Sequence, residues 1–240
     1  MPGLTWLFDL DNTLHNASHA IFPAINANMN AFMAKVLGSD DVPADAATVD
    51  AVRLAYWKRY GATLLGMVRH HQVRAEDFLR EAHRFDDLRT MIRAERGLGR
   101  LLRRLPGRKI LLTNAPRRYS HEVMRHLGLH RHFAKHIAIE AMHVHRQLRP
   151  KPSKQLLRKI IARERTPACR CILVEDTVDN LKAAKALGMH TAWVTRYLAT
   201  SPNHRQAAGT LPLRFTKRPI YVDVKVKSVR QLPSSLHRLR

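Results

Sequence analysis

The feature that most constrains the fold is a regular alternation of short apolar runs and amphipathic segments in the second half of the chain. Strand-like runs occur at about 109–113, 136–139, 170–174 and 191–194, and segments with helical spacing separate them. An earlier apolar run, Trp6-Leu7-Phe8, ends at Asp9. Near-continuous apolar strands that alternate with helices are typical of parallel sheets covered on both faces. The pattern therefore predicts an α/β fold with a doubly wound parallel sheet.

The region between the first two of these strands has a different pattern. Apolar residues recur there at helical spacing, and no run resembles a strand. Helices are predicted at about 18–37, 46–60, 62–70 and 75–84. We therefore expect an α/β core formed by 1–16 and 87–240 and a helical domain formed by 17–86. A helix at 88–105, a surface loop at 200–218 and an edge strand at 221–229 are also predicted.

Composition indicates an ordinary soluble protein. Of 240 residues, 45% are hydrophobic and 25% are charged, and no run approaches the roughly 18 apolar residues that a membrane span requires. Asp9 and Asp11 interrupt the first apolar stretch, which argues against a secretory signal, so we expect a cytoplasmic protein without a membrane partner. Cys169 and Cys171 are too close for an easy disulfide and are predicted to be reduced thiols packed at the start of a strand.

The net charge is the unusual quantity. Lys and Arg number 42 against 19 Asp and Glu, which gives a formal charge of +23. Such a balance attracts polyanions. The basic residues are spread through every segment without a dense block, which favours a solvated, Arg-rich surface over a dedicated nucleic-acid site. Nothing in the composition indicates an oligomeric state.

Polar residues follow the predicted strands at the points where they end. Asp9 and Asp11 follow the first strand, Thr113 and Asn114 end the second, and Glu175 and Asp176 end a third, with Asp179 close by. In addition, Lys151 lies in a loop that leads into a helix. Ligands of open parallel sheets bind beyond the carboxyl ends of the strands, so we expect these side chains to converge on one site.

The chemistry of these side chains indicates a metal and a phosphate. Several carboxylates that face one another repel unless a cation lies between them, and Mg²⁺ prefers oxygen ligands. Lys151 would add a fixed positive charge, and Thr113 and Asn114 offer donors to phosphate oxygens. Positioning, charge neutralisation and a nucleophile are what phosphoryl transfer requires.

The runs that carry these residues resemble the motifs of one family. Asp9-Leu10-Asp11-Asn12-Thr13-Leu14 resembles the DxDxT motif of the haloacid dehalogenase-like hydrolases. The run 111–114 resembles their second motif, Lys151 their third, and 174–180 their fourth, in the family's order. The resemblance implies a Rossmann-like core with an α-helical cap domain inserted after the first strand.

The resemblance also implies roles for the residues. Asp9 would be the nucleophile that forms an aspartyl-phosphate, and Asp11 would be the general acid and base. Mg²⁺ would be held by Asp9, Glu175, Asp176 and the backbone carbonyl of Asp11. Asp179 would support the site through water or by orienting Lys151. The second acid, Asp11, favours a phosphatase over a dehalogenase.

The helical insert resembles the cap of the pyrimidine 5'-nucleotidase branch in the run from Tyr56 to His71. This resemblance implies a nucleoside 5'-monophosphate as substrate, with Tyr56, Tyr60 and Arg69 as specificity residues. The branch has two aspartates in its fourth motif, whereas this chain has Glu175 and Asp176. Two alternatives remain: a phosphatase of sugar or other small-metabolite phosphates, and a basic nucleic-acid-associated protein whose main feature is its charge.

Overall fold

The computed structural model describes residues 3–198 and 217–239. The loop predicted at 200–218 therefore lies, apart from its last two residues, outside the described residues. The chain divides into two compact units. We call Met1–Ser18 together with Ile92–Arg240 the core unit, and His19–Met91 the helical unit.

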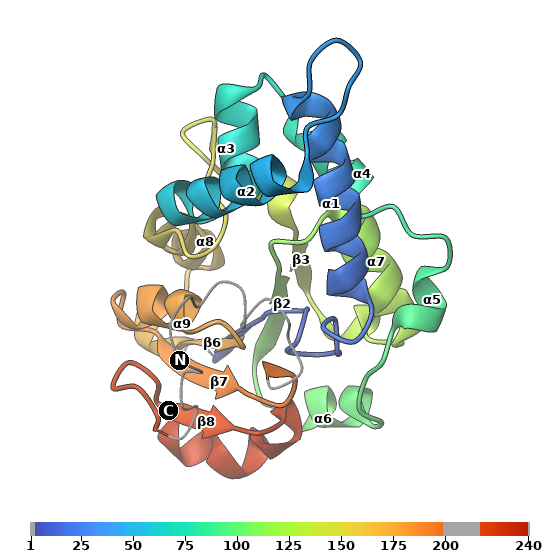
Figure 1. Cartoon of the computed structure of the whole chain (residues 1–240). Coiled ribbons are helices and arrows are strands. Elements are labelled where there is room, and N and C mark those ends of the chain that lie inside the picture. The colour runs from blue at the N-terminus through green and yellow to red at the C-terminus, as the bar shows by residue number, and fades with distance from the viewer. Residues whose placement is uncertain (1–2, 199–216, 240) are drawn as a thin grey trace. The chain divides into compact units, whose positions relative to one another are not determined.

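The core unit is built on one parallel sheet, which confirms the predicted fold class. Among the described residues, six strands occur in the order β3-β2-β1-β6-β7-β8, and every neighbouring pair is parallel (Figure 1). The strands are β1 (Thr5–Phe8), β2 (Arg108–Leu112), β3 (Lys135–Ile137), β6 (Cys171–Glu175), β7 (His190–Val194) and β8 (Val224–Val226). The predicted edge strand at 221–229 is thus present but shorter.

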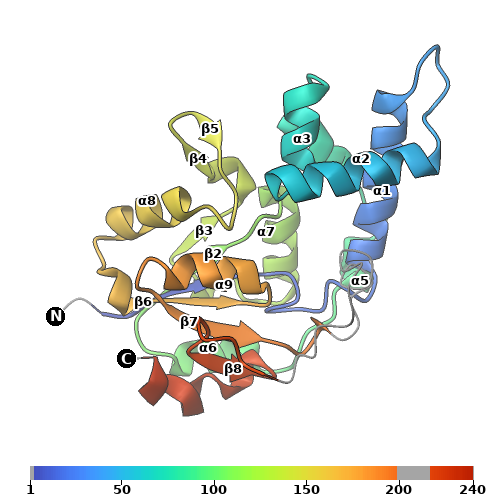
Figure 2. The same cartoon turned by 60° about the vertical axis from the view of Figure 1, so that its left-hand side comes forward.

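The helices of this unit cover both faces of the sheet. They are α6 (Leu98–Arg104), α7 (Arg117–His126), α8 (Lys154–Glu164) and α9 (Val178–Lys185). In the view of Figure 2, α8 and α9 lie above the sheet and α6 lies below it. The chain leaves β1 towards β2 on one side and later returns to β6 on its other side. This reversal is the topological switch point at which ligands of such sheets bind.

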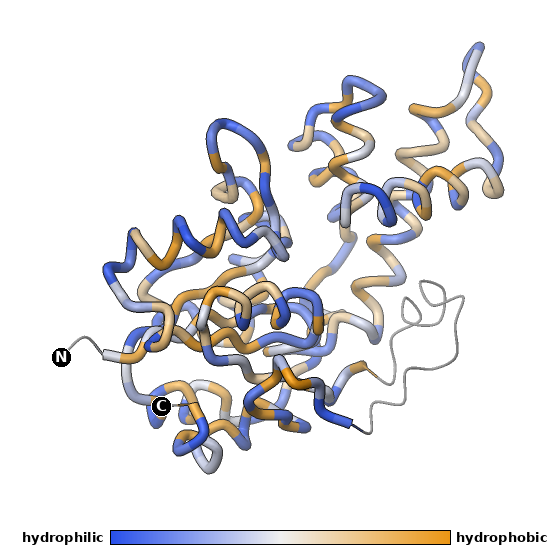
Figure 3. The backbone as a smooth tube through the Cα atoms, turned by 90° about the vertical axis from the view of Figure 1, so that its left-hand side faces the viewer, coloured by the Kyte–Doolittle hydropathy of each residue, from blue (hydrophilic) through white to orange (hydrophobic). Residues whose placement is uncertain are grey.

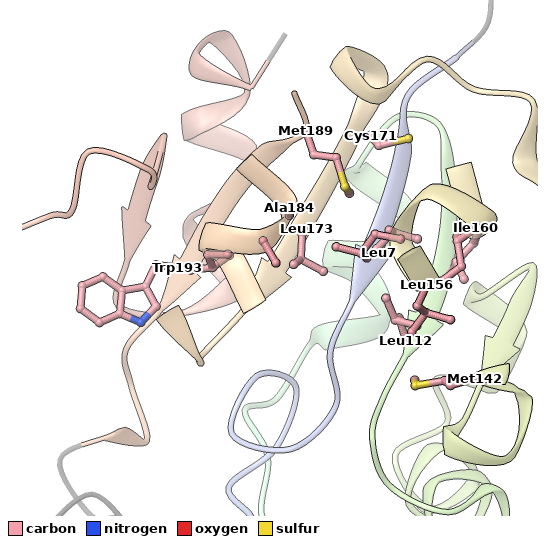
Figure 4. Packing of buried hydrophobic residues seen from close by; sticks show 14 of the residues in the cluster. Leu7, Leu112, Met142, Leu156, Ile160, Cys171, Leu173, Ala184, Met189 and Trp193 are labelled. Atoms are coloured by element: carbon pink, nitrogen blue, oxygen red, sulfur yellow. The ribbon is translucent and has the colours of Figure 1, made fainter. Parts of the chain in front are cut away.

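The core itself follows from the alternation of side chains along the strands. Leu7 and Leu173, on adjacent strands, pack with Leu156 and Ile160 of α8 on one face (Figure 4). Phe8 points to the opposite face, where its ring meets the ring of Phe133 edge-on at 5.9 Å. All four residues of β1 are buried, so the strand that leads to Asp9 is held on both sides.

Two parts of the chain differ from the predictions. The predicted helix at 88–105 is interrupted between α5 (Leu88–Met91) and α6. Gly97 has φ +81°, which a continuous helix excludes, and the carbonyl of Arg93 accepts from the backbone N–H of Asn16. A hairpin of β4 (His143–Val144) and β5 (Gln147–Leu148) was not predicted. Short 3₁₀ turns occur at His130–His132, Ile139–Ala141, Ala168–Arg170, Val229–Gln231 and Pro233–Arg238.

The helical unit contains α1 (Ile21–Leu37), α2 (Ala46–Tyr60), α3 (Thr63–His70), α4 (Ala75–Ala82) and α5. The side chain of Asp45 caps α2 by accepting from the N–H of Thr48, and Gly61 ends the helix at φ +77°. Phe32 and Phe78 join α1 to α4 edge-on, with ring centroids 5.6 Å apart. The alternation of hydrophilic and hydrophobic residues along these helices is visible in Figure 3.

The remaining sequence predictions concern the cysteines and the membrane. Both cysteines are reduced, as predicted, and Cys171 is buried in β6. Cys169 is exposed in a 3₁₀ turn, so the prediction that it packs inside was wrong. Within residues 3–198 and 217–239, no helix is long and apolar enough to cross a membrane.

Candidate active site

The site begins with the residues that leave β1. The backbone N–H of Asp9 still pairs with the carbonyl of Val174 on β6, so the sheet fixes the position of this aspartate. Beyond it the chain turns sharply: Asn12 has φ +58°, a conformation that Asn tolerates better than most residues. The amide of Asn12 then bonds to both the backbone N–H and the hydroxyl of Ser18, which closes the loop.

Lys151 joins the carboxylates of two strands. Its Nζ donates to Asp9 Oδ1 at 2.6 Å and to Glu175 Oε1 at 2.7 Å. The three side chains are at most 9% exposed. Charged groups are buried in proteins when they are paired, and here one ammonium serves two carboxylates. The structure thus brings together three residues that the sequence placed in separate motifs.

Thr113 and Asn114 hold this arrangement from the end of β2. The Thr113 hydroxyl accepts from the N–H of Ala115 at 3.1 Å and is buried. The amide of Asn114 bonds to both the N–H and the carbonyl of Lys151, each at 3.0 Å. Asn114 therefore positions the backbone of Lys151, while a role as a phosphate donor stays a prediction for both residues.

Four groups donate hydrogen bonds to the Glu175 carboxylate. Its Oε2 accepts from the backbone N–H groups of Asp176 at 2.8 Å and Thr177 at 2.9 Å. Its Oε1 accepts from Lys151 and from the amide of Asn180. The indole of Trp193 on β7 donates to the Asp176 carbonyl at 2.9 Å and so fixes the adjoining loop.

The electrostatics of the cluster follow from this packing. Burial, together with the charge of Glu175, raises the pKa of Asp9 to about 7, although Lys151 acts in the opposite direction. Burial also acts to raise the pKa of Glu175, but Lys151 and the hydrogen bonds hold it below its usual value. The pKa of Asp176 is raised by burial and then by Glu175 and Asp9. The site contains more negative charge than Lys151 alone can neutralise.

The same three carboxylates could hold a cation. Asp9, Glu175 and Asp176 each offer an oxygen, and these oxygens lie within 4.8 Å of one another. Hard divalent cations take carboxylate oxygens, and a cation between the three groups would offset their mutual repulsion. The donor set therefore fits the predicted metal. Whether the carbonyl of Asp11 joins it stays a prediction.

Asp11 is placed two residues beyond Asp9, and its side chain is 16% exposed. Its Oδ1 accepts from the hydroxyl of Tyr119 at 2.5 Å and lies 2.8 Å from Nε2 of His15. Neither partner was predicted, although His15 follows Asp11 by four residues.

Asn180, the neighbour of Asp179 in the sequence, was not predicted as a site residue either. The Asp179 side chain is exposed and makes no hydrogen bond or ion pair with Lys151 in the described structure, so it does not orient Lys151 directly.

The predicted specificity residues lie in the helical unit and form a cluster of their own. The hydroxyl of Tyr56 is 2.6 Å from His71 Nε2, and that of Tyr60 is 2.5 Å from His70 Nε2. The Arg69 guanidinium lies 5.9 Å from the centre of the Tyr60 ring. Tyr56 also packs against α3 at Gly66, where an added Cβ would come within 2.1 Å of the ring. Tyr56 is thus part of the helix packing, and a role in specificity stays a prediction for all three.

The geometry can be compared with known proteins. Residues 5–188 match the haloacid dehalogenase-like hydrolase family. The chain belongs to this family. The resemblance seen in the four motifs is confirmed, and the chain is a hydrolase of the haloacid dehalogenase type. The pyrimidine 5'-nucleotidase branch remains a prediction.

Solved structures of the same fold cover nearly the whole chain. A phosphatase of the family from Thermococcus onnurineus aligns with a TM-score of 0.62 at 15% identity, over 98% of each chain. L-2-haloacid dehalogenase from Xanthobacter autotrophicus, with chloropropionic acid covalently bound, gives a TM-score of 0.57 at 15% identity over 98% of each chain. The putative hydrolase YfnB from Bacillus subtilis, bound to magnesium, gives 0.55 at 13% identity over 98% and 99%. At these identities the likeness concerns the fold, which accommodates more than one chemistry.

Proposed function

We propose that this hydrolase is a Mg²⁺-dependent phosphatase of small-molecule phosphate monoesters that works through an aspartyl-phosphate. The observation that carries the proposal is the buried contact of Asp9 with Lys151, within reach of Glu175 and Asp176. This arrangement combines a carboxylate nucleophile with cationic and metal-binding groups for a phosphate. Phosphoryl transfer depends mainly on such positioning and charge neutralisation.

The first step would form the bond between an Asp9 oxygen and phosphorus while the ester P–O bond breaks. The departing alkoxide would take a proton from the carboxyl of Asp11. Lys151 would bind the phosphate oxygens and stabilise the charge on them. A cation held by Asp9, Glu175 and Asp176 would neutralise the negative charge shared by phosphate and carboxylates.

The second step would release inorganic phosphate. Asp11, now ionised, would take a proton from a water molecule, whose oxygen bonds to phosphorus as the bond to Asp9 breaks. Each proton given in the first step is recovered in the second.

Asp11 favours this chemistry over dehalogenation, the reaction for which the similar L-2-haloacid dehalogenase is named. A halide leaves as a stable anion and needs no proton, whereas an alkoxide does. A carboxyl group held by Tyr119 and His15 beside the nucleophile supplies such a proton. The observation supports a phosphatase without identifying the ester.

The substrate we propose first is a nucleoside 5'-monophosphate, with a pyrimidine base preferred. Its support is the resemblance of the run from Tyr56 to His71 and the aromatic character of the cluster there. Tyr60 is half-buried and Arg69 is exposed, and the two offer a ring and a guanidinium to a planar base. Sugar phosphates are the alternative.

The test is phosphate release with Mg²⁺ from p-nitrophenyl phosphate, nucleoside monophosphates and sugar phosphates, with wild type and Asp9→Asn. We expect Asp9→Asn to lower kcat/KM by at least about 10³-fold, because the covalent route is lost. Chelation of the metal should act in the same direction. Asp41→Asn, the same change at an exposed loop residue, is the matched control. A wild-type protein that releases phosphate from none of these esters would refute the proposal.

A further inference from the structure

Asp11 has two donors on one of its oxygens. Tyr119, at the third position of α7, donates its hydroxyl to Oδ1 at 2.5 Å, and His15 Nε2 lies 2.8 Å from the same atom. The hydroxyl of Tyr119 and Nε2 of His15 are themselves only 3.4 Å apart. The residues come from separate segments of the core unit, yet they meet around a single carboxylate oxygen.

Both donors are buried. His15 is 0% and Tyr119 is 3% exposed, so water does not compete for these hydrogen bonds. Each side chain is also fixed by the backbone around it: His15 by the loop that pairs residue 15 with residue 11, and Tyr119 by the first turn of α7. A buried donor that lost Asp11 would lose a hydrogen bond to a carboxylate, and this favours the observed geometry.

The surroundings of the other ring nitrogen, Nδ1, indicate which nitrogen of His15 carries the hydrogen. Nδ1 has no hydrogen-bond partner among the described residues and is buried. A proton there would be an unsatisfied buried donor, whereas an unpaired acceptor is less unfavourable. Hydrogen on Nε2 rather than on Nδ1 therefore fits, and Nε2 then donates to Asp11 as Tyr119 does.

We propose that His15 and Tyr119 are positioning residues that hold the Asp11 carboxyl group in the orientation in which it exchanges a proton with the ester oxygen. The inference rests on the proposed phosphatase function. Loss of the two donors would remove two restraints on rotation of the Asp11 side chain about its χ1 and χ2 bonds. Proton transfer would then occur from a smaller fraction of its conformations. Asp9 and Glu175 have their own hydrogen bonds to Lys151, so we expect these three residues to stay in place when a donor to Asp11 is removed.

Leaving groups separate this role from a structural one. An alkyl phosphate releases a basic alkoxide and needs the Asp11 proton, whereas p-nitrophenyl phosphate releases a stable anion. We expect Tyr119→Phe to lower kcat/KM for an alkyl phosphate by about 10- to 100-fold, and for p-nitrophenyl phosphate by no more than about threefold. The second step needs Asp11 as a base for either ester. For p-nitrophenyl phosphate, kcat and KM should therefore fall together.

His15 provides a second, independent variant. His15→Leu removes the donor and should reproduce the selective loss, and His15→Gln restores an N–H donor and should recover most of it. Tyr221→Phe removes a hydroxyl elsewhere in the core unit and is the matched control. We expect it to change kcat/KM for neither substrate. The far-ultraviolet circular dichroism and the thermal unfolding of each variant show that it is folded.

The outcomes are distinct. Equal losses of kcat/KM on both esters, or no loss of kcat/KM on the alkyl ester, would overturn the positioning role while the phosphatase proposal stands. Wild-type protein without phosphate release from any ester would overturn the proposed function and this inference with it. A loss confined to the alkyl ester, with rescue by His15→Gln, supports the role.

Discussion

Between His19 and Met91 the chain has nine Lys or Arg and nine Asp or Glu, whereas the rest of the chain has 33 and 10. The helical unit is therefore neutral, and the whole net charge of +23 belongs to the core unit. Basic residues occur in both units, in keeping with the prediction that they are spread through every segment, but their excess over acidic residues lies in the core unit. The two units therefore differ in net charge.

The acids of the two units explain the difference. In the helical unit several acids pair with arginines at the surface, as Asp77 does with Arg80 at 2.8 Å and Glu76 with Arg74 at 2.9 Å. In the core unit, five of the ten acids belong to the predicted site, and Glu164 is buried between Arg108 and Lys135. Few acids of the core unit are left to neutralise its surface. The comparison separates charges that are fixed in a buried network from charges that are balanced locally.

The largest effect should come from breaking the buried network. Lys151→Met would leave Asp9 and Glu175 facing each other without their shared ammonium. We expect the free energy of unfolding in chelator to fall by about 3–5 kcal/mol, as for other buried pairs that lose one partner. Added Mg²⁺ should recover part of this loss, because it binds the same carboxylates in the native state only. Denaturant unfolding with and without Mg²⁺ measures both.

The control is the same substitution at a surface pair. Lys185 contacts Asp223 at 2.5 Å but its side chain is 36% exposed, so Lys185→Met should lower the free energy of unfolding by only about 0–1 kcal/mol and show no response to Mg²⁺. Equal losses for the two variants would mean that the buried network adds no more stability than a surface pair.

The second prediction concerns packing in the neutral unit. Gly66 lies inside α3, where Ala is ordinarily more stable than Gly by about 1 kcal/mol. Here an added Cβ would come within 2.1 Å of Cγ of Tyr56. We expect Gly66→Ala to lower the free energy of unfolding by about 1–3 kcal/mol, because the ring must move.

The Tyr56→Ala background tests the cause of this effect. With the ring removed, Gly66→Ala should become neutral or stabilising, and the double-mutant cycle gives the coupling between the two positions. A stabilising Gly66→Ala in the wild-type background would show that α2 and α3 are not packed through this contact. The packing would then leave Tyr56 available for a substrate.

Most of the site could be predicted because each of its main residues ends a strand-like run. Asp9, Thr113 and Glu175 follow apolar segments that form β1, β2 and β6, and parallel strands bring their carboxyl ends together. Lys151 lies in a loop without such a run; the sequence shows it as a cation in a loop before a helix, and the resemblance matches it to the family's third motif. His15 and Tyr119 could not be predicted, because their contacts with Asp11 depend on tertiary structure and no local pattern marks them.

The errors in the fold have similar causes. The hairpin of β4 and β5 turns at His145 and Arg146, with φ +48° and +63°, and lacks the Asn-Gly pair that usually marks such turns. The helix predicted at 88–105 is broken where Glu95 contacts Arg196 and Ser228, both distant in the sequence. Local patterns predicted the elements with long apolar runs, and tertiary contacts decided the rest.

The smallest effect should be seen in the binding of polyanions. The pKa of His132 is lowered, first by burial and then by the charges of Arg103, Arg131 and Lys109. This indicates a local concentration of positive charge in the core unit, and the smallest predicted effect depends on it.

We expect a short DNA duplex to bind weakly and with strong salt dependence. Changing Arg103, Lys109 and Arg131 to Gln should reduce the slope of log Kd against log salt by about 2–3, whereas changing Arg59, Arg69 and Arg74 should reduce it by less than about one. Both sets remove three charges, so equal changes would show that only net charge matters and that the asymmetry between the units has no role in binding. Asp9→Asn should leave the slope unchanged, since the carboxylate network is separate from this surface.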